Sequence, residues 1–247
     1  MKAYSLIAYG LFTLLVNLIS LDCQAGKEVS DFMYCINQIK QMKSCMYDYS
    51  LQVKFEDGTT ETVKGQSYFD VPNQYVYNSN SEATILYDGK WYYNANHDQK
   101  EVTIYRMDKR FRPGVADSMR KEIFQLGVYN DMMDSLVLKY GRVPAVVKSN
   151  NKIKFDILFI PNSYIKRISI EFDMKTNLLI KCEVEAYFSI ENYGNEQHKA
   201  TQVMTCTNYK RTPDTDVAKL DSYFSAGAND KNIKLLKYKN YKLITTK

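Results

Sequence analysis

The chain has 247 residues, which is enough for one good-sized domain or two small ones. Hydrophobic residues make up 45% and charged residues 25%, a composition that excludes a disordered chain. The formal net charge is +5, but the basic residues form no stripe interleaved with aromatic rings, which argues against a nucleic-acid-binding protein. The 21 tyrosines favour a β-rich fold, because tyrosine suits strands and half-wet surfaces.

Residues 1–25 have the layout of a secretory signal peptide. Lys2 supplies the positive start, Leu6 to Leu21 is a mostly apolar run, and Ala25 is a small residue suited to cleavage. The run is short for a membrane span, which needs about 20 residues. Lipid attachment at Cys23 is the alternative, although the residues before it do not fit the usual site. The sequence therefore predicts export, to the periplasm, of a mature chain that begins after Ala25.

The first half of the mature chain predicts one helix followed by strands. Apolar side chains spaced by three and four indicate an amphipathic helix over residues 28–43. The period then changes to two, which indicates a strand that ends near Phe55, and Asp57-Gly58 turns it into a second strand over residues 59–69. Val71-Pro72-Asn73 interrupts the pattern before a third strand begins.

The stretch from Ser81 to Asp108 predicts a three-stranded meander. Its first gap, Asp88-Gly89, suits a two-residue hairpin loop because glycine adopts a positive φ at no steric cost. This loop would pair Leu86 with Trp91. Because side chains alternate across a strand, Leu86, Trp91 and Tyr93 would share the face that is the better candidate for the interior.

The second half predicts a helical insert and then more strands. The insert covers residues 114–140, and strand patterns follow at about 152–159, 168–172, 184–188 and 199–209. Because most strands can pair with their sequence neighbours, the predicted fold class is α+β, mainly antiparallel β, in one domain over residues 26–247. A solvated basic tail is the interpretation of the final lysines, with weak attraction to anionic membranes as the alternative. These are Lys231, Lys234, Lys237, Lys239, Lys242 and Lys247.

The mature chain has four cysteines, and an even number in an exported protein points toward disulfides. If the last two long strands turn around Gly194, Cys182 lies opposite Cys206, within reach of a disulfide after a small adjustment. Cys35 and Cys45 would then link the first helix to the first strand. Four buried thiols without disulfides are the alternative.

No catalytic group stands out. His97 and His198 are assigned to turns or their flanks, and no nucleophile motif accompanies either. The cysteines lack the close pairing and neighbouring histidines of a zinc site, and no glycine-rich phosphate loop occurs. We expect no metal, no cofactor and no enzymatic activity.

Three short sequence motifs resemble those of the outer-membrane lipoprotein carrier (LolA-like) superfamily. They are Val71-Pro72-Asn73-Gln74-Tyr75, Tyr87-Asp88-Gly89-Lys90-Trp91-Tyr92-Tyr93 and Glu101-Val102-Thr103-Ile104. The resemblance implies an unclosed (half) β-barrel with an N-terminal helix and with the insert at 114–140 as a lid. Val71 stands where the family carrier has an arginine that helps to hold the closed lid, so ligand handover would differ.

On this resemblance the protein would be a periplasmic, non-enzymatic carrier or binding protein that accepts the acyl chains of a lipid or lipoprotein on the concave sheet face. A sensor or interaction module that binds a protein partner and transports nothing is the alternative. We expect a monomer, with a possible partner protein in the inner or outer membrane. The sequence leaves a ligand cavity and a packed core equally open. The side chains predicted to line the concave face are Phe55, Tyr75, Tyr77, Leu86, Trp91, Tyr93, Val102, Ile104, Phe155 and Ile157.

Overall fold

The computed structural model describes residues 27–107, 114–119, 131–160, 164–189, 197–210, 219–227 and 232–245. The predicted signal peptide, its cleavage point after Ala25 and the alternative lipid site at Cys23 lie outside these residues. No helix among the described residues is both long and apolar enough to cross a membrane.

The chain forms two compact units. Unit 1 is Met1–Gln41, Ser50–Thr62 and Phe124–Thr205, and unit 2 is Met42–Tyr49, Val63–Ile123 and Cys206–Lys247. Three long strands contribute residues to both units, namely β1 (Ser44–Phe55), β2 (Thr60–Asp70) and β11 (Gln197–Lys210). The prediction of one domain over residues 26–247 stays a prediction.

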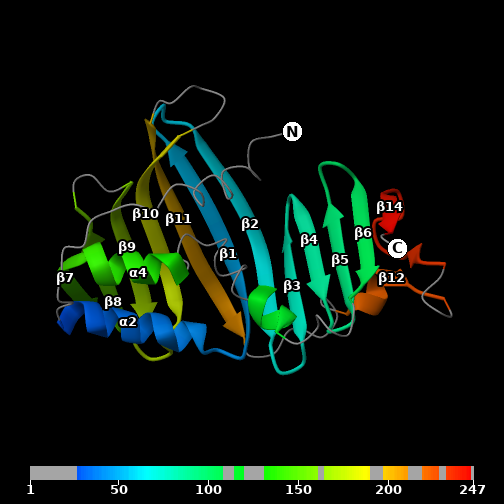
Figure 1. Ribbon diagram of the computed structural model, residues 1–247, viewed down its shortest axis with the longest axis horizontal. Helices are drawn as coiled ribbons and strands as arrows, with labels where there is room; N and C mark the ends of the chain where they lie inside the picture. Colours follow the sequence, from blue (N-terminus) through cyan, green and yellow to red (C-terminus); the bar gives the residue numbers. More distant parts are fainter. Residues whose placement is uncertain are drawn as a thin grey trace. The chain divides into compact units, whose positions relative to one another are not determined.

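Unit 2 is built on an almost wholly antiparallel sheet, in the order β14-β6-β5-β4-β3-β2-β1 (Figure 1). The strands β4, β5 and β6 form the predicted three-stranded meander, β3 precedes it, and each of the four pairs with its sequence neighbour. The exception is the edge strand β14, which pairs parallel to β6. The strands are β3 (Tyr75–Asn80), β4 (Ala83–Tyr87), β5 (Trp91–Asn96), β6 (Glu101–Arg106) and β14 (Lys242–Thr245).

The hairpin between β4 and β5 differs from the predicted register by two positions. Leu86 pairs with Tyr93 rather than with Trp91. The loop lies one residue later than predicted because the Asp88 carboxylate accepts the backbone N–H of Lys90 at 2.9 Å and of Trp91 at 2.7 Å. Gly89, with a φ of 85°, supplies the required positive dihedral. A shift of two preserves the alternation, so Leu86, Trp91 and Tyr93 are all buried on one face, as predicted.

We expect Asp88→Ala to lower the free energy of unfolding by about 1–3 kcal/mol, because it removes an acceptor shared by two backbone N–H groups. Asp88→Asn is the matched control, since its amide oxygen accepts the same bonds without the charge, and it should lose less. Urea unfolding followed by circular dichroism measures both. Equal losses for the two variants would contradict the role assigned to the shared acceptor.

Unit 1 places two helices on one face of a five-stranded antiparallel sheet in the order β11-β10-β9-β8-β7 (Figure 1). The strands other than β11 are β7 (Arg142–Ser149), β8 (Lys152–Leu158), β9 (Ile165–Asp173) and β10 (Leu179–Ser189). The helices are α2 (Lys27–Lys40) and α4 (Asp131–Tyr140), joined by the ion pair between Lys40 and Asp134. Phe32 of α2 packs edge-on against Phe155 of β8, with ring centroids 5.4 Å apart.

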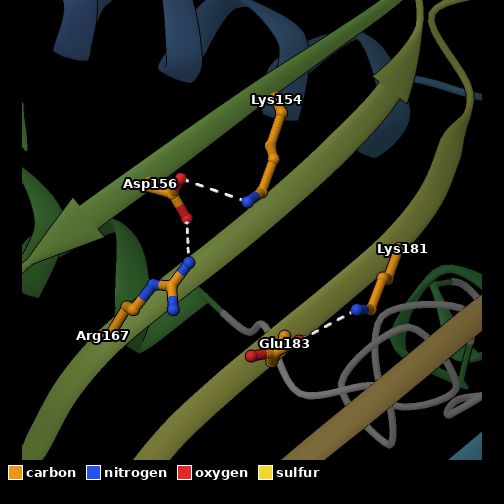
Figure 2. A network of polar contacts seen from close by, with 5 residues as sticks. All are labelled: Lys154, Asp156, Arg167, Lys181 and Glu183. Atoms are coloured by element: carbon orange, nitrogen blue, oxygen red, sulfur yellow. Dashed lines mark hydrogen bonds and ion pairs between the residues drawn. The ribbon is translucent and has the colours of Figure 1, made fainter. Parts of the chain in front are cut away.

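The opposite face of these strands carries charged side chains that pair with one another (Figure 2). Asp156 accepts hydrogen bonds from Arg167 at 2.6 Å and from Lys154 at 3.2 Å, and Lys181 pairs with Glu183 at 2.9 Å. Burial alone would raise the pKa of Asp156, but the bonds from Arg167, Ser169 and Lys154 lower it below its usual value. Partly exposed pairs of this kind contribute about 0–1 kcal/mol each, so the face is a solvated surface rather than a second core.

The helical insert predicted at 114–140 is described in part. Residues 115–119 are helical and Ala116 is buried in unit 2, while α4 belongs to unit 1. Residues 120–130 lie outside the described part of the chain. The role of a lid therefore stays a prediction.

The predicted register of the cysteine-bearing hairpin is wrong. Cys182 pairs with Met204, because the register of β10 and β11 is shifted by two positions from the predicted one, and Cys206 lies two positions further along. Cys35, Cys45, Cys182 and Cys206 are all buried and form no disulfide, so the predicted pairs Cys182–Cys206 and Cys35–Cys45 are absent from this structure. Burial raises the pKa of the Cys45 thiol to about 11 and that of Cys206 to about 12, so both are protonated at neutral pH.

Candidate functional site

One face of the unit 2 sheet is lined almost entirely by rings and aliphatic side chains, and we call it the apolar face. It arises from the two-residue alternation of β1 to β6, which directs every second side chain to the same side. Seven of the ten side chains predicted to line a concave surface belong to it, and all of them except the half-buried Tyr75 are buried. The apolar face consists of Met46, Tyr68, Tyr75, Tyr77, Leu86, Trp91, Tyr93, Ala95, Val102 and Ile104.

The other three predicted side chains belong to unit 1. Phe155 and Ile157 are fully buried in β8, where Phe155 contacts Phe172 with ring centroids 6.1 Å apart, in addition to Phe32. Phe55 is half-buried near the end of β1. Seven of the predicted residues therefore share one face of the unit 2 sheet, and these three belong to unit 1. Ligand binding by any of the ten stays a prediction.

The apolar face is covered by the C-terminal part of the same chain, and we call residues 219–227 and 232–245 the cover segment (Figure 1, orange to red). Its elements are short: η2 (Leu220–Ser222), β12 (Phe224–Ser225), β13 (Lys234–Leu235) and β14. The interpretation as a solvated basic tail is wrong, because the lysines alternate with side chains that pack on the sheet. The packed side chains are Leu220, Tyr223, Phe224, Ile233, Leu235, Tyr238, Tyr241 and Leu243.

Aromatic contacts dominate the packing of the cover segment. The Phe224 ring meets Trp91 edge-on at 5.4 Å and stacks parallel to Tyr93 at 6.1 Å, and Tyr223 meets Tyr93 edge-on at 5.3 Å. Such ring pairs contribute about 0.5–1.5 kcal/mol each beyond the area that they bury. In this structure the apolar face is therefore packed against the cover segment.

A cluster of hydroxyl groups and one imidazole lies beside these rings. His97 directly follows β5, as the predicted turn requires, but its ring is only partly exposed. Its Nε2 lies 3.0 Å from Thr84 Oγ1 and its Nδ1 lies 3.1 Å from the Tyr241 hydroxyl. The Tyr238 hydroxyl lies 3.3 Å from the same Thr84 oxygen, and Ser79 lies 2.9 Å from it. The cluster therefore links the sheet to the cover segment, which turn chemistry alone did not predict.

The electrostatics of this cluster favour uncharged side chains. Burial and the nearby Lys237 ammonium lower the pKa of His97, and Asp98 opposes them. Burial has the opposite effect on the phenols, because their charged form is the deprotonated one: it raises the pKa of Tyr93 and of Tyr223, so both are neutral. Lys237 Nζ lies 4.5 Å from the centre of the Tyr223 ring and donates to the Tyr223 hydroxyl at 3.3 Å.

Two buried hydroxyl groups of the apolar face, those of Tyr75 and Tyr93, have no hydrogen-bond partner among the described residues. A buried hydroxyl without a partner costs about 1–3 kcal/mol, so the packed state carries a penalty at this face. The described residues include no group of three or more His, Cys, Asp or Glu side chains that could hold a metal ion. What the face offers chemically is burial of apolar surface next to hydroxyl donors.

Comparisons with known proteins give matches among solved structures alone. No known protein family and no curated protein matches the sequence. An uncharacterised conserved protein from Thermus thermophilus is 7% identical, with a TM-score of 0.40, over 87% of this chain and 99% of that one. A LolA superfamily protein from Nitrosomonas europaea is 10% identical, with a TM-score of 0.31, over 78% and 98%. A putative outer membrane lipoprotein-sorting protein domain from Vibrio parahaemolyticus is 9% identical, with a TM-score of 0.29, over 78% and 94%.

Proposed function

We propose that the protein is a non-enzymatic binding protein whose apolar face accepts an acyl chain of a lipid or lipidated protein when the cover segment moves away. The observation that carries the proposal is the contrast between the two sides of this core. One side is a regular sheet that presents seven of the predicted lining residues, and the other is a segment whose elements before β14 have two or three residues each. The part of the cover segment before β14 has little internal hydrogen bonding, so it can leave its site while β14 stays paired with β6 in the sheet.

The energetics of such an exchange are balanced. Burying a methylene group contributes about 0.8 kcal/mol, so a long acyl chain gains on the order of 10 kcal/mol and can compete with the rings of the cover segment. The hydroxyls of Tyr75 and Tyr93, which have no partner among the described residues, add to the advantage of opening. With the cover segment displaced, water or the polar end of a ligand would supply the missing partners.

The location that we propose is the periplasm, on the strength of the signal-peptide layout of residues 1–25. A monomer suits a carrier that exchanges its ligand with membranes. Val71, in place of the family's arginine, implies that the closed state is held by other contacts than those of the family carrier. The cover segment, with its contacts to Trp91 and Tyr93, is our candidate for that role.

The proposal is tested by measuring lipid binding directly. The mature chain, from residue 26, is expressed in a membrane-containing host and analysed by native mass spectrometry, and a fluorescent fatty-acid probe is then displaced with hexadecanoate. We expect bound lipid and saturable displacement. Phe224→Ala should tighten the apparent affinity about tenfold or more, because weakening the cover segment raises the fraction of binding-competent molecules.

Phe172→Ala is the matched control, since it removes a buried ring from unit 1 and leaves the cover segment intact. Its apparent affinity should equal that of the wild type. No bound lipid and no displacement, in the wild type and in Phe224→Ala alike, would overturn the carrier proposal and favour the interaction module.

A further inference from the structure

The cover segment is held on the sheet by the pairing of β14 with β6 at its C-terminal end. Before β14 it is held by packed side chains and by one imidazole. The two ring nitrogens of His97 face Thr84 of β4 on one side and Tyr241 of the cover segment on the other, at 3.0 and 3.1 Å. The His97 ring also lies against the rings of Tyr238 at 4.9 Å and Tyr241 at 5.9 Å. His97 and Tyr241 are 144 residues apart in the chain, so these contacts exist only while the cover segment is in place.

The groups that face His97 leave little room for a positive charge. From the cover segment come the Lys237 ammonium and the hydroxyls of Tyr238 and Tyr241. β4 contributes the uncharged Thr84, and the turn itself contributes Asp98, the one anion in the set and an exposed one. The backbone N–H of His97 donates to the carbonyl of Glu82 at 2.8 Å, which fixes the ring's position on the sheet.

We propose that His97 is a latch: its neutral imidazole holds the part of the cover segment before β14 on the apolar face, and its protonation releases that part, while β14 stays paired with β6. The inference rests on the proposed function for its purpose, because the released surface is the one that would take an acyl chain. The opening itself can be observed without any ligand.

The direction of the pH effect follows from linkage. The pKa of His97 is lowered in the closed state by burial and by Lys237, so the closed state binds fewer protons than a state in which the ring is exposed. The latch is therefore fully effective above the ordinary histidine pKa of about 6.5 and weakens as the pH falls below it. Each pKa unit that separates the two states changes the opening equilibrium about tenfold.

The experiment is hydrogen exchange of the intact mature protein at pH 7.5 and pH 5.0, corrected for the intrinsic exchange rate. We expect protection of peptides from residues 232–241 to fall about tenfold at the lower pH, for each pKa unit of difference between the states. Peptides from β9 in unit 1 should keep their protection. The chain has two histidines, so few groups titrate in this window.

Two variants assign the effect to a residue. His97→Gln keeps a donor and an acceptor but cannot be protonated, and its protection should be the same at both pH values. His198→Gln, at the other histidine, should behave as the wild type. Because His97→Gln could fold poorly, the titration of the two histidine rings in the wild type is followed by nuclear magnetic resonance. We expect the midpoint of His97 to lie below the ordinary histidine value.

The outcomes separate the latch from the binding function. Protection that does not change with pH in the wild type, pH dependence retained in full by His97→Gln, or a His97 midpoint at or above the ordinary value would each overturn the latch. Loss of protection at pH 5.0 without binding of the fatty-acid probe would support the latch and remove the carrier proposal. Binding of the fatty-acid probe, with protection that does not change with pH, would support the carrier proposal and overturn the latch.

Discussion

Trp91→Ala will lower the free energy of unfolding by about 3–5 kcal/mol, the usual cost of replacing a buried tryptophan with alanine. Trp91 is only 7% exposed, lies in the apolar face and meets the Phe224 ring edge-on. Its removal leaves a void that the rigid sheet cannot close. Urea unfolding followed by circular dichroism measures the loss, since the variant lacks the chain's one tryptophan and its fluorescence.

Tyr92→Ala is the control for this variant. Tyr92 is the next residue on β5, points to the other side of the sheet, is half-buried, and stacks on Tyr105 at 4.9 Å. It should lose about 1 kcal/mol, from its ring pair and part of its buried area. A loss below 1 kcal/mol for Trp91→Ala, together with weaker binding of the fatty-acid probe, would mean that Trp91 lines an open cavity in solution.

Phe155→Ala will destabilise unit 1 by about the same amount, 3–5 kcal/mol. Phe155 is fully buried and lies against two other rings, Phe32 of α2 and Phe172 of β9. The variant removes the aromatic contact through which α2 meets β8. Guanidinium unfolding, with hydrogen exchange of α2 peptides as a local probe, should show both a lower midpoint and loss of protection in the helix.

Two controls bracket the effect of Phe155→Ala. Phe155→Leu keeps an apolar side chain of comparable volume and should cost less than about 1.5 kcal/mol. Arg167→Ala removes an ion pair from the charged face of the same sheet and should cost about 0–1 kcal/mol. A large loss for Arg167→Ala, or a small one for Phe155→Ala, would show that the core of unit 1 lies on the opposite face of its strands.

Hydrophobic periodicity predicted the elements better than it predicted their partners. Apolar side chains spaced by three and four from Val29 to Ile39 predicted α2, and two-residue alternation predicted the strands of the meander. Both predictions succeeded because each signal lies within a single element. Leu86 and Tyr93 share a face whether the hairpin register is the predicted one or the observed one, because a shift of two leaves the alternation unchanged.

The parts that sequence reasoning missed depend on contacts between distant residues or on turn details. The β10–β11 register differs from the predicted one by two positions, and that shift places Met204 rather than Cys206 opposite Cys182. The cover segment has the composition of a basic tail, and side chains such as Leu220, Tyr223 and Leu235 are buried only because β3 to β6 offer a surface for them. One signal was available in the sequence: Lys234 and Lys237 are interspersed with Leu235 and with tyrosines, a pattern that a solvated tail has no reason to show.

The order in which the chain is synthesised gives the cover segment a further consequence. Thr84 and Tyr238, which meet in the folded protein, are 154 residues apart, so the unit 2 core stays incomplete until the cover segment has left the ribosome. Long-range closure of this kind is slow. Until then β6 is an unprotected sheet edge beside an exposed aromatic surface, which is a template for aggregation and a target for chaperones. A chain truncated before residue 220 would therefore expose the same surface that the cover segment conceals.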